Sequence, residues 1–139
     1  MSDVDSPVSE MRLVVTAEDF EAAIAFYRDV LGLPERASYA SNDGRVVILE
    51  AGRATLEIAD PAQAAFIDRV EVGRRVAGHI RVAFEVTDSA ATARALVAGG
   101  AALIADATRT PWETDNARLD APAGLQLTLF SDAPPVAAD

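Results

Sequence analysis

The side chains that could perform chemistry in this sequence are few, and their types exclude several mechanisms. Cysteine is absent, which excludes disulfides, thiolate metal sites and cysteine nucleophiles. All twelve basic residues are arginine, so no lysine can form a Schiff base with a substrate. The single histidine, His79, could act as a general base, but no residue beside it in the sequence supplies a partner, and a surface or rim position is the alternative. One histidine cannot build a His-rich metal site.

Arginine leads a pattern that the chain contains twice. Arg12 begins the segment Arg-Leu-Val-Val-Thr-Ala-Glu-Asp, and Arg81 begins the segment Arg-Val-Ala-Phe-Glu-Val-Thr-Asp. In each copy alternating apolar residues predict a strand, and the aspartate seven positions after the arginine predicts the start of a helix. The two copies indicate a duplicated strand and helix unit.

The first half of the chain is predicted to contain a strand, a helix and three further short strands. The first strand covers residues 11–16, and Asp19 is the expected N-cap of a helix over 20–31. A turn sequence at 41–44 separates two of the three strands expected within 36–59. The helix has one apolar stripe, which we expect in the core and which consists of Phe20, Ile24, Tyr27 and Leu31.

The second half repeats this order after a linker. Asp60 and Pro61 have the residue types of a helix start and predict a linker helix over 62–72. The elements expected after it are a strand over 79–86, a helix over 89–98 and strands over 102–105, 116–120 and 125–130. We therefore predict one domain over 9–131, divided into modules at 9–60 and 79–131 and a linker at 61–78, with loose tails at 1–8 and 132–139.

Composition and charge restrict the partners. A chain of 139 residues that is 50% hydrophobic can form one ordinary core. The net charge of −10 argues against binding to nucleic acid or to an anionic membrane, both of which need basic surface. The acid excess provides solubility or, alternatively, a surface for cations. The acidic start of the chain and the absence of a long apolar run predict a cytoplasmic protein.

Four segments of the sequence resemble a known family. They are Ala25-Phe-Tyr-Arg-Asp-Val-Leu-Gly-Leu33, Val82-Ala-Phe-Glu-Val-Thr-Asp88, Pro111-Trp112 and Ala121-Pro-Ala-Gly124. Together with the duplicated order of elements, they are similar to the vicinal-oxygen-chelate superfamily, which includes glyoxalase I, bleomycin-resistance proteins and extradiol dioxygenases. The resemblance covers residues 9–131. It implies an α+β fold in which two βαβββ modules form a cupped, half-barrel mixed sheet of the glyoxalase/bleomycin-resistance type.

The resemblance also implies where the enzymes of this superfamily hold a metal ion, at inward positions of the first and fourth strands of each module. Those positions are Arg12, Glu57, Arg81 and Thr128 in this sequence. Only Glu57 is a usual metal ligand, because guanidinium groups stay protonated and have no lone pair to donate. We therefore expect no metal and no organic cofactor. The alternative is a divalent metal held by other groups, such as Glu57, His79 or Glu85.

Two interpretations follow for these positions. If a pseudo-twofold axis relates the modules, Glu57 lies near both Arg12 and Arg81. The cluster could bind a small anionic or carbonyl-bearing ligand, with Glu57 orienting the arginines or acting as a base. Alternatively, the cluster is an internal set of ion pairs that contacts nothing else.

Further residues are assigned to the wall of the expected cleft. Trp112 could form an aromatic wall or a hydrophobic plug, and Tyr39 and Ile48 are expected to extend the wall. In the last strand, the side chains expected to face the cavity are Gln126, Thr128 and Phe130. The side chains expected in the core are Leu125, Leu127 and Leu129.

These observations favour a homodimeric protein that binds a small organic molecule in the cupped sheet, as in antibiotic sequestration, and lacks the usual metal site. The alternative is a lyase, isomerase or dioxygenase of the same superfamily, which would use atypical metal ligands or Glu57 as the base. A third possibility is a subunit that uses the fold only for association.

Overall fold

The computed structural model describes residues 12–54, 57 and 59–133 of the chain. Its elements in chain order are helix α1 (Phe20–Ile24), π-helical turn η1 (Ala25–Val30), strands β1 (Glu35–Ser41) and β2 (Gly44–Leu49), helix α2 (Pro61–Glu71), strand β3 (Val82–Glu85), helix α3 (Ser89–Ala98), strands β4 (Ala102–Arg109) and β5 (Thr114–Ala121), the short turn η2 (Pro122–Gly124) and strand β6 (Leu125–Asp132). Within the described residues, no helix is long and apolar enough to cross a lipid bilayer.

The second half forms a complete βαβββ module. Its four strands lie in the order β3-β6-β5-β4, with β3 parallel to β6 and the other neighbours antiparallel. Asp88 accepts a hydrogen bond from the backbone N–H of Ala91 and begins α3, and Gly99 ends this helix, as predicted. The α+β class and the mixed sheet are confirmed, although the described strands form an uncurled sheet and a separate hairpin instead of one continuous cup.

One face of this sheet forms the hydrophobic core under α3. The strand residues buried there are Ala117, Leu119, Leu127 and Leu129, which alternate with polar neighbours along β5 and β6. Ala93 and Leu96 of α3 cover them. The prediction that Leu127 and Leu129 belong to the core is therefore confirmed, and Leu125 packs against it.

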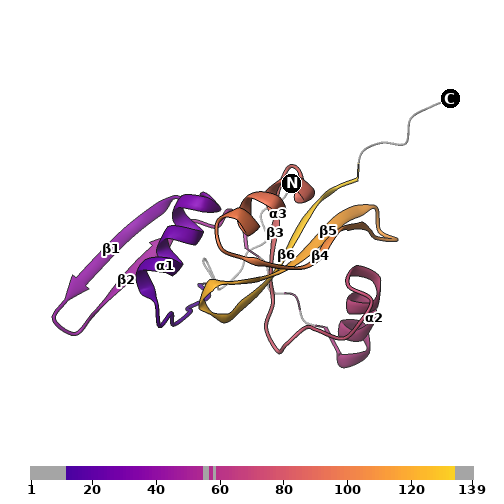
Figure 1. The fold of residues 1–139 in the computed structure, drawn as a ribbon. Helices are drawn as coiled ribbons and strands as arrows, with labels where there is room; N and C mark the ends of the chain where they lie inside the picture. The colour runs from indigo at the N-terminus through magenta and orange to yellow at the C-terminus, as the bar shows by residue number, and fades with distance from the viewer. Residues whose placement is uncertain (1–11, 55–56, 58, 134–139) are drawn as a thin grey trace, which may run out of the picture.

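The first half is less regular than its sequence predicts. Residues 12–17 were expected to form most of the first strand, but they have no regular secondary structure. Strands β1 and β2 form an antiparallel hairpin around the predicted turn, and Figure 1 shows this hairpin extending away from the four-stranded sheet. The third expected strand falls at 55–59, where residues 55, 56 and 58 lie outside the described residues. A strand needs a paired neighbour to satisfy its backbone groups, and the alternating pattern at 12–17 supplied no information about one.

The predicted first helix exists, but it buries different side chains. From Ala25 it widens into a π turn, in which the backbone N–H of Leu31 bonds to the carbonyl oxygen of Phe26. Its fully buried residues are Ala23 and Phe26. Of the predicted stripe, Tyr27 and Leu31 pack partly buried against the core, and Phe20 and Ile24 are partly buried elsewhere. Tyr27 packs at the edge of the core.

Contacts of this helix join the two halves. The Tyr27 hydroxyl donates a 2.7 Å hydrogen bond to the carbonyl oxygen of Pro122, and burial raises the pKa of Tyr27 to about 12. At the end of α3, a β-carbon added to Gly99 would lie 2.5 Å from a methyl group of Val30. Glycine therefore allows the close approach of η1 and α3.

Candidate ligand-binding site

The second face of the four-stranded sheet is polar. Its side chains on β5 and β6 are Asn116, Arg118, Gln126 and Thr128, which confirms that Gln126 and Thr128 point away from the leucine core. Helix α2 packs against β4 and β5, and its carboxylates contact this polar face, so α2 and α3 lie on opposite sides of the sheet (Figure 1). The β3 side of the polar face remains open, since Ala83 and Glu85 are exposed there.

Three residues form a row on this face, two of them on β5 and β6 and the third just before β3. Arg118 lies opposite Thr128 in the β5–β6 ladder. On the other side of Thr128, Nη1 of Arg81 donates a 2.5 Å hydrogen bond to its Oγ1. The structure therefore brings together two of the predicted site residues, Arg81 and Thr128. It also corrects the predicted strand over 79–86, because β3 begins at Val82 and both His79 and Arg81 precede it.

The charge of Arg81 is incompletely compensated. Its guanidinium is half-buried, and burial followed by the nearby charge of Arg118 lowers its pKa. Glu71, Glu57 and Asp68 act in the opposite direction and do not restore the ordinary value. Among the described residues, the hydrogen bond to Thr128 is the one recorded for Arg81, so the other N–H groups of this guanidinium are available to an acceptor.

The predicted cluster of Arg12, Glu57 and Arg81 is present only in part. Glu57 is exposed and acts on Arg81 through its charge, with no direct hydrogen bond recorded between them. Arg12 is exposed at the beginning of the described residues. The three residues therefore do not form the compact set of ion pairs that a pseudo-twofold axis suggested, because residues 12–17 have not formed the strand that would direct Arg12 inward.

A different ion cluster fills the polar face, and the sequence analysis did not find it. Arg118 is 0% exposed, and its Nη1 and Nη2 each lie 2.9 Å from a carboxylate oxygen, of Asp68 and Glu71 respectively. Arg118 also donates hydrogen bonds from Nε to Glu71 and from Nη1 to Gln126, and Asn116 donates one to Glu71. Charged groups this deeply buried are tolerated only when they are paired in this way.

Asp68 joins this cluster to the loop that leads to Arg81. Its Oδ2 accepts hydrogen bonds from the side chain of Arg75 and from the backbone N–H groups of Val76 and Ala77, at 2.7–2.9 Å. Burial raises the pKa of Asp68, but these hydrogen bonds and the one from Arg118 lower it by more, so the pKa lies below its ordinary value of 3.8. Asp68 therefore stays charged and fixes the loop against α2.

Two signals in the sequence could have indicated this cluster. Asp68 and Glu71 are three residues apart, which places both carboxylates on one side of the linker helix. Arg118 lies between Ala117 and Leu119 in a predicted strand, so its side chain must point to the face opposite theirs. Neither pattern shows that the two elements meet, because they are some 50 residues apart in the chain.

The other predicted wall residues lie elsewhere. Trp112 is partly exposed in the β4–β5 turn and contacts Phe66 of α2, with ring centroids 6.3 Å apart. Tyr39 and Ile48 share one face of the β1–β2 hairpin, where Tyr39 is 64% exposed. His79 is exposed and lies in the segment before β3. The aromatic wall around Arg81 is therefore not formed by these residues in the described structure.

Comparison with known proteins identifies the family. Residues 12–130 match the family described as the glyoxalase-like domain. This chain belongs to that family. No curated protein matched the sequence. A glyoxalase-like domain with a vicinal-oxygen-chelate fold is what the sequence analysis predicted.

Solved structures of the same fold support this assignment. An antibiotic binding protein from Streptomyces sp. CB03234 is 22% identical, with a TM-score of 0.61 over 93% of this chain and 100% of its own. A lactoylglutathione lyase from Agrobacterium tumefaciens is 25% identical, with a TM-score of 0.52 over 90% of this chain and 95% of its own. A protein of unknown function from Agrobacterium tumefaciens is 26% identical, with a TM-score of 0.56 over 91% of this chain and 98% of its own.

The residues of this glyoxalase-like domain do not fit the metal that the superfamily resemblance implies. Of the four implied ligand positions, Arg12 and Arg81 carry guanidinium groups, and Thr128 is hydrogen-bonded to one of them. Within the described part of the chain, no three His, Cys, Asp or Glu side chains are placed to share a metal ion. The donor set at this position suits an anion or a carbonyl oxygen better than a cation.

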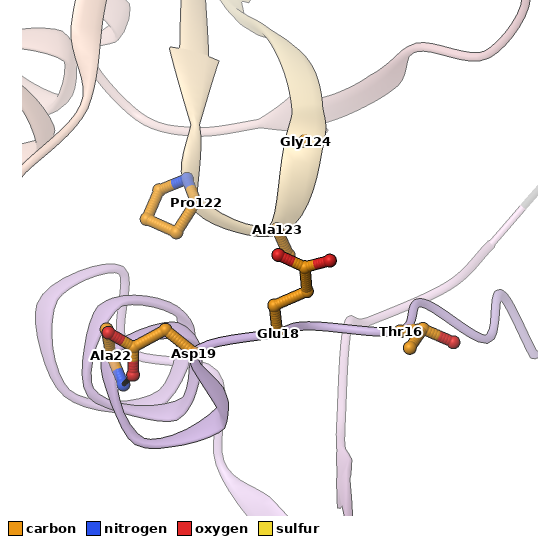
Figure 2. A pocket seen from close by; sticks show the side chains of 7 residues that line it. All are labelled: Thr16, Glu18, Asp19, Ala22, Pro122, Ala123 and Gly124. Atoms are coloured by element: carbon orange, nitrogen blue, oxygen red, sulfur yellow. Dashed lines mark hydrogen bonds between the residues drawn. The ribbon is translucent and has the colours of Figure 1, made fainter.

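Two hollows border the described surface. One, of about 420 Å³, is lined by Glu85, Val86, Thr87 and Asp132 at the end of β3 and β6. Arg81, Ala83 and Glu85 are two residues apart in an extended segment and share one face. This hollow therefore continues the open part of the polar face. The other, of about 500 Å³, lies between the α1 entry and the η2 turn, and in Figure 2 the Glu18 side chain points toward Ala123. Of these two hollows, the one beside Glu85 borders the polar face that contains Arg81.

Proposed function

We propose that this glyoxalase-like protein binds a small organic molecule on the open part of its polar sheet face, without a shared metal ion. Arg81 would hold an acidic or carbonyl group of the ligand, and the buried Thr128 would orient its guanidinium. The observation that supports this most directly is the half-buried Arg81, which has one recorded hydrogen bond and a lowered pKa. Burial removes water molecules from this guanidinium. An oxygen atom of the ligand would accept hydrogen bonds in their place and compensate the positive charge.

The surroundings of Arg81 support a ligand of modest size. Ala83 follows it on the same face and presents only a methyl group, so the floor between Arg81 and Glu85 is open. Four residues of strand span about 13 Å, which is the length of a small organic molecule. The likeness to an antibiotic binding protein is consistent with sequestration as the role, although at 22% identity the shared fold is all that the comparison shows.

Loss of the Arg81 guanidinium is expected to abolish ligand binding. In a thermal-shift screen of anionic, neutral and cationic small molecules, hits should raise the melting temperature of the natural protein and leave Arg81→Ala unchanged, because a ligand that binds only the folded state stabilises it. Arg94→Ala is the matched control, since it removes the same charge from the exposed surface of α3 and should keep every hit. If hits stabilise Arg81→Ala as much as the natural protein, this face is not the site.

We also propose that the protein works as a homodimer. Residues 12–17 expose Leu13 and Val14 at 52% and 85%, which a second copy could cover. Sedimentation at several protein concentrations should give twice the mass of 14.6 kDa. A mass that stays at one chain throughout would exclude this part of the proposal.

A further inference from the structure

The fully buried side chains of helix α2 are charged and not apolar. Its two buried residues are Asp68 and Glu71, and both are paired with Arg118. Among the described residues, the apolar core and the side chains packed against it include no residue of α2. Helices of globular proteins usually dock through an apolar face, so this attachment is unusual.

The apolar residues of α2 are only partly buried. They are Ala64, Ala65, Ile67 and Val70, together with Phe66, which forms an aromatic pair with Trp112. Phe66 is 38% exposed and Trp112 is 42% exposed, and their rings are tilted by 51°. Such a pair contributes little compared with a buried apolar face. Buried ion pairs add little net stability either, because the desolvation of the charges offsets their attraction. The docking of this helix of 11 residues therefore depends largely on the pairing of its two carboxylates with Arg118.

The carboxylates of α2 occupy the position that a ligand would take. Asp68 and Glu71 approach Arg118 with the charge-assisted geometry by which arginine binds an acidic ligand. Arg118 lies opposite Thr128 on the neighbouring strand, and Thr128 is hydrogen-bonded to Arg81. A ligand with two acidic groups could thus contact both arginines, but only when α2 leaves the sheet.

We infer that α2 is a displaceable cover of the ligand site, and that an organic dianion binds by taking the place of Asp68 and Glu71 at Arg118. This inference rests on the proposed function, since it concerns the same face of the sheet. It adds the class of ligand, which is a dicarboxylate or a similarly doubly charged acid. It also adds an internal competitor, because the apparent affinity is the intrinsic affinity multiplied by the fraction of molecules in which α2 is undocked.

Glu71→Gln tests the cover in the absence of any ligand. The substitution removes one of the two charges that hold α2, and we expect hydrogen exchange of the α2 amides to become about 10- to 100-fold faster, the range for a lost hydrogen bond to a charged group. Amides of β5 and β6 should keep their protection. Asp106→Asn, at an exposed position of β4, is the control and should change neither. If α2 and the strands lose protection together, or if α2 is unaffected, the helix is a fixed part of the fold and the inference fails.

A titration tests the ligand class. Trp112 is the single tryptophan of the chain and touches α2, so its fluorescence reports whether the helix is docked. Succinate should change this emission in a saturable way, at a lower concentration in Glu71→Gln than in the natural protein, because the internal competitor is weakened. Sodium chloride at equal ionic strength should not do so. If succinate acts no differently from sodium chloride, a dianion does not displace α2. Hits that depend on Arg81 in the thermal-shift screen would in that case still support the proposed function.

Discussion

Phe26→Ala is expected to lower the free energy of unfolding by about 3–5 kcal/mol, the range for truncation of a buried phenylalanine. Phe26 is 2% exposed and is the main side chain that the first half contributes to the core of the second half. Its ring also packs edge-on against Tyr27, with centroids 4.9 Å apart. Truncation would therefore leave a cavity and weaken the junction between the halves.

Urea unfolding followed by circular dichroism, at one fixed protein concentration, measures this loss. Phe26→Leu is the graded control and should cost less than about 1.5 kcal/mol, because it keeps most of the apolar volume. If Phe26→Ala costs under about 1 kcal/mol, the first helix does not pack in the core as described.

Asp68→Asn is expected to lower the stability at neutral pH by about 1.5–3 kcal/mol, since an amide cannot replace the charged acceptor of Arg118 and Arg75. The folded-state pKa of Asp68 lies below 3.8, so its carboxylate contributes stability that is present above about pH 4 and is lost as the pH falls below that value. The difference between the natural protein and the variant should therefore shrink in acid.

The same unfolding experiment at pH 7 and at several acidic values tests this expectation. Asp120→Asn removes an exposed carboxylate from β5 and should change the stability little at any pH. A difference between the natural protein and Asp68→Asn that is constant from pH 7 to strongly acidic conditions would show that the Asp68 charge is not the source of the stabilisation.

The replacement of a metal position by an arginine has a simple physical reading in this fold. The row of Arg81, Thr128 and Arg118 repels a divalent cation and attracts oxygen anions. The protein itself supplies two such anions, from Asp68 and Glu71, at one end of the row. In the proposed displacement of α2, a ligand would compete with these internal carboxylates for Arg118.

Local pattern was sufficient to predict most of the elements. The N-caps Asp19, Asp60 and Asp88 each accept a hydrogen bond from a backbone N–H of the helix that follows, because a short carboxylate before a helix is placed to do so in any context. The alternation along 125–130 predicted correctly that Leu125, Leu127 and Leu129 of β6 face the apolar core. The duplicated order of elements led to the correct family.

Tertiary structure decided the composition of the site. Whether residues 12–17 become a strand depends on a partner strand, and which charges meet depends on where the linker helix docks. Arg118 and Asp68 are 50 residues apart, and no local pattern encodes their contact. The sequence by itself determined the helices, most strands, the family and the choice of Arg81 as a candidate site residue. These follow from short-range periodicity and residue chemistry. Only the packing of α2 on the sheet decided that Arg118 is the buried partner of Asp68 and Glu71. Ion pairs between distant residues form where the fold brings buried charges together.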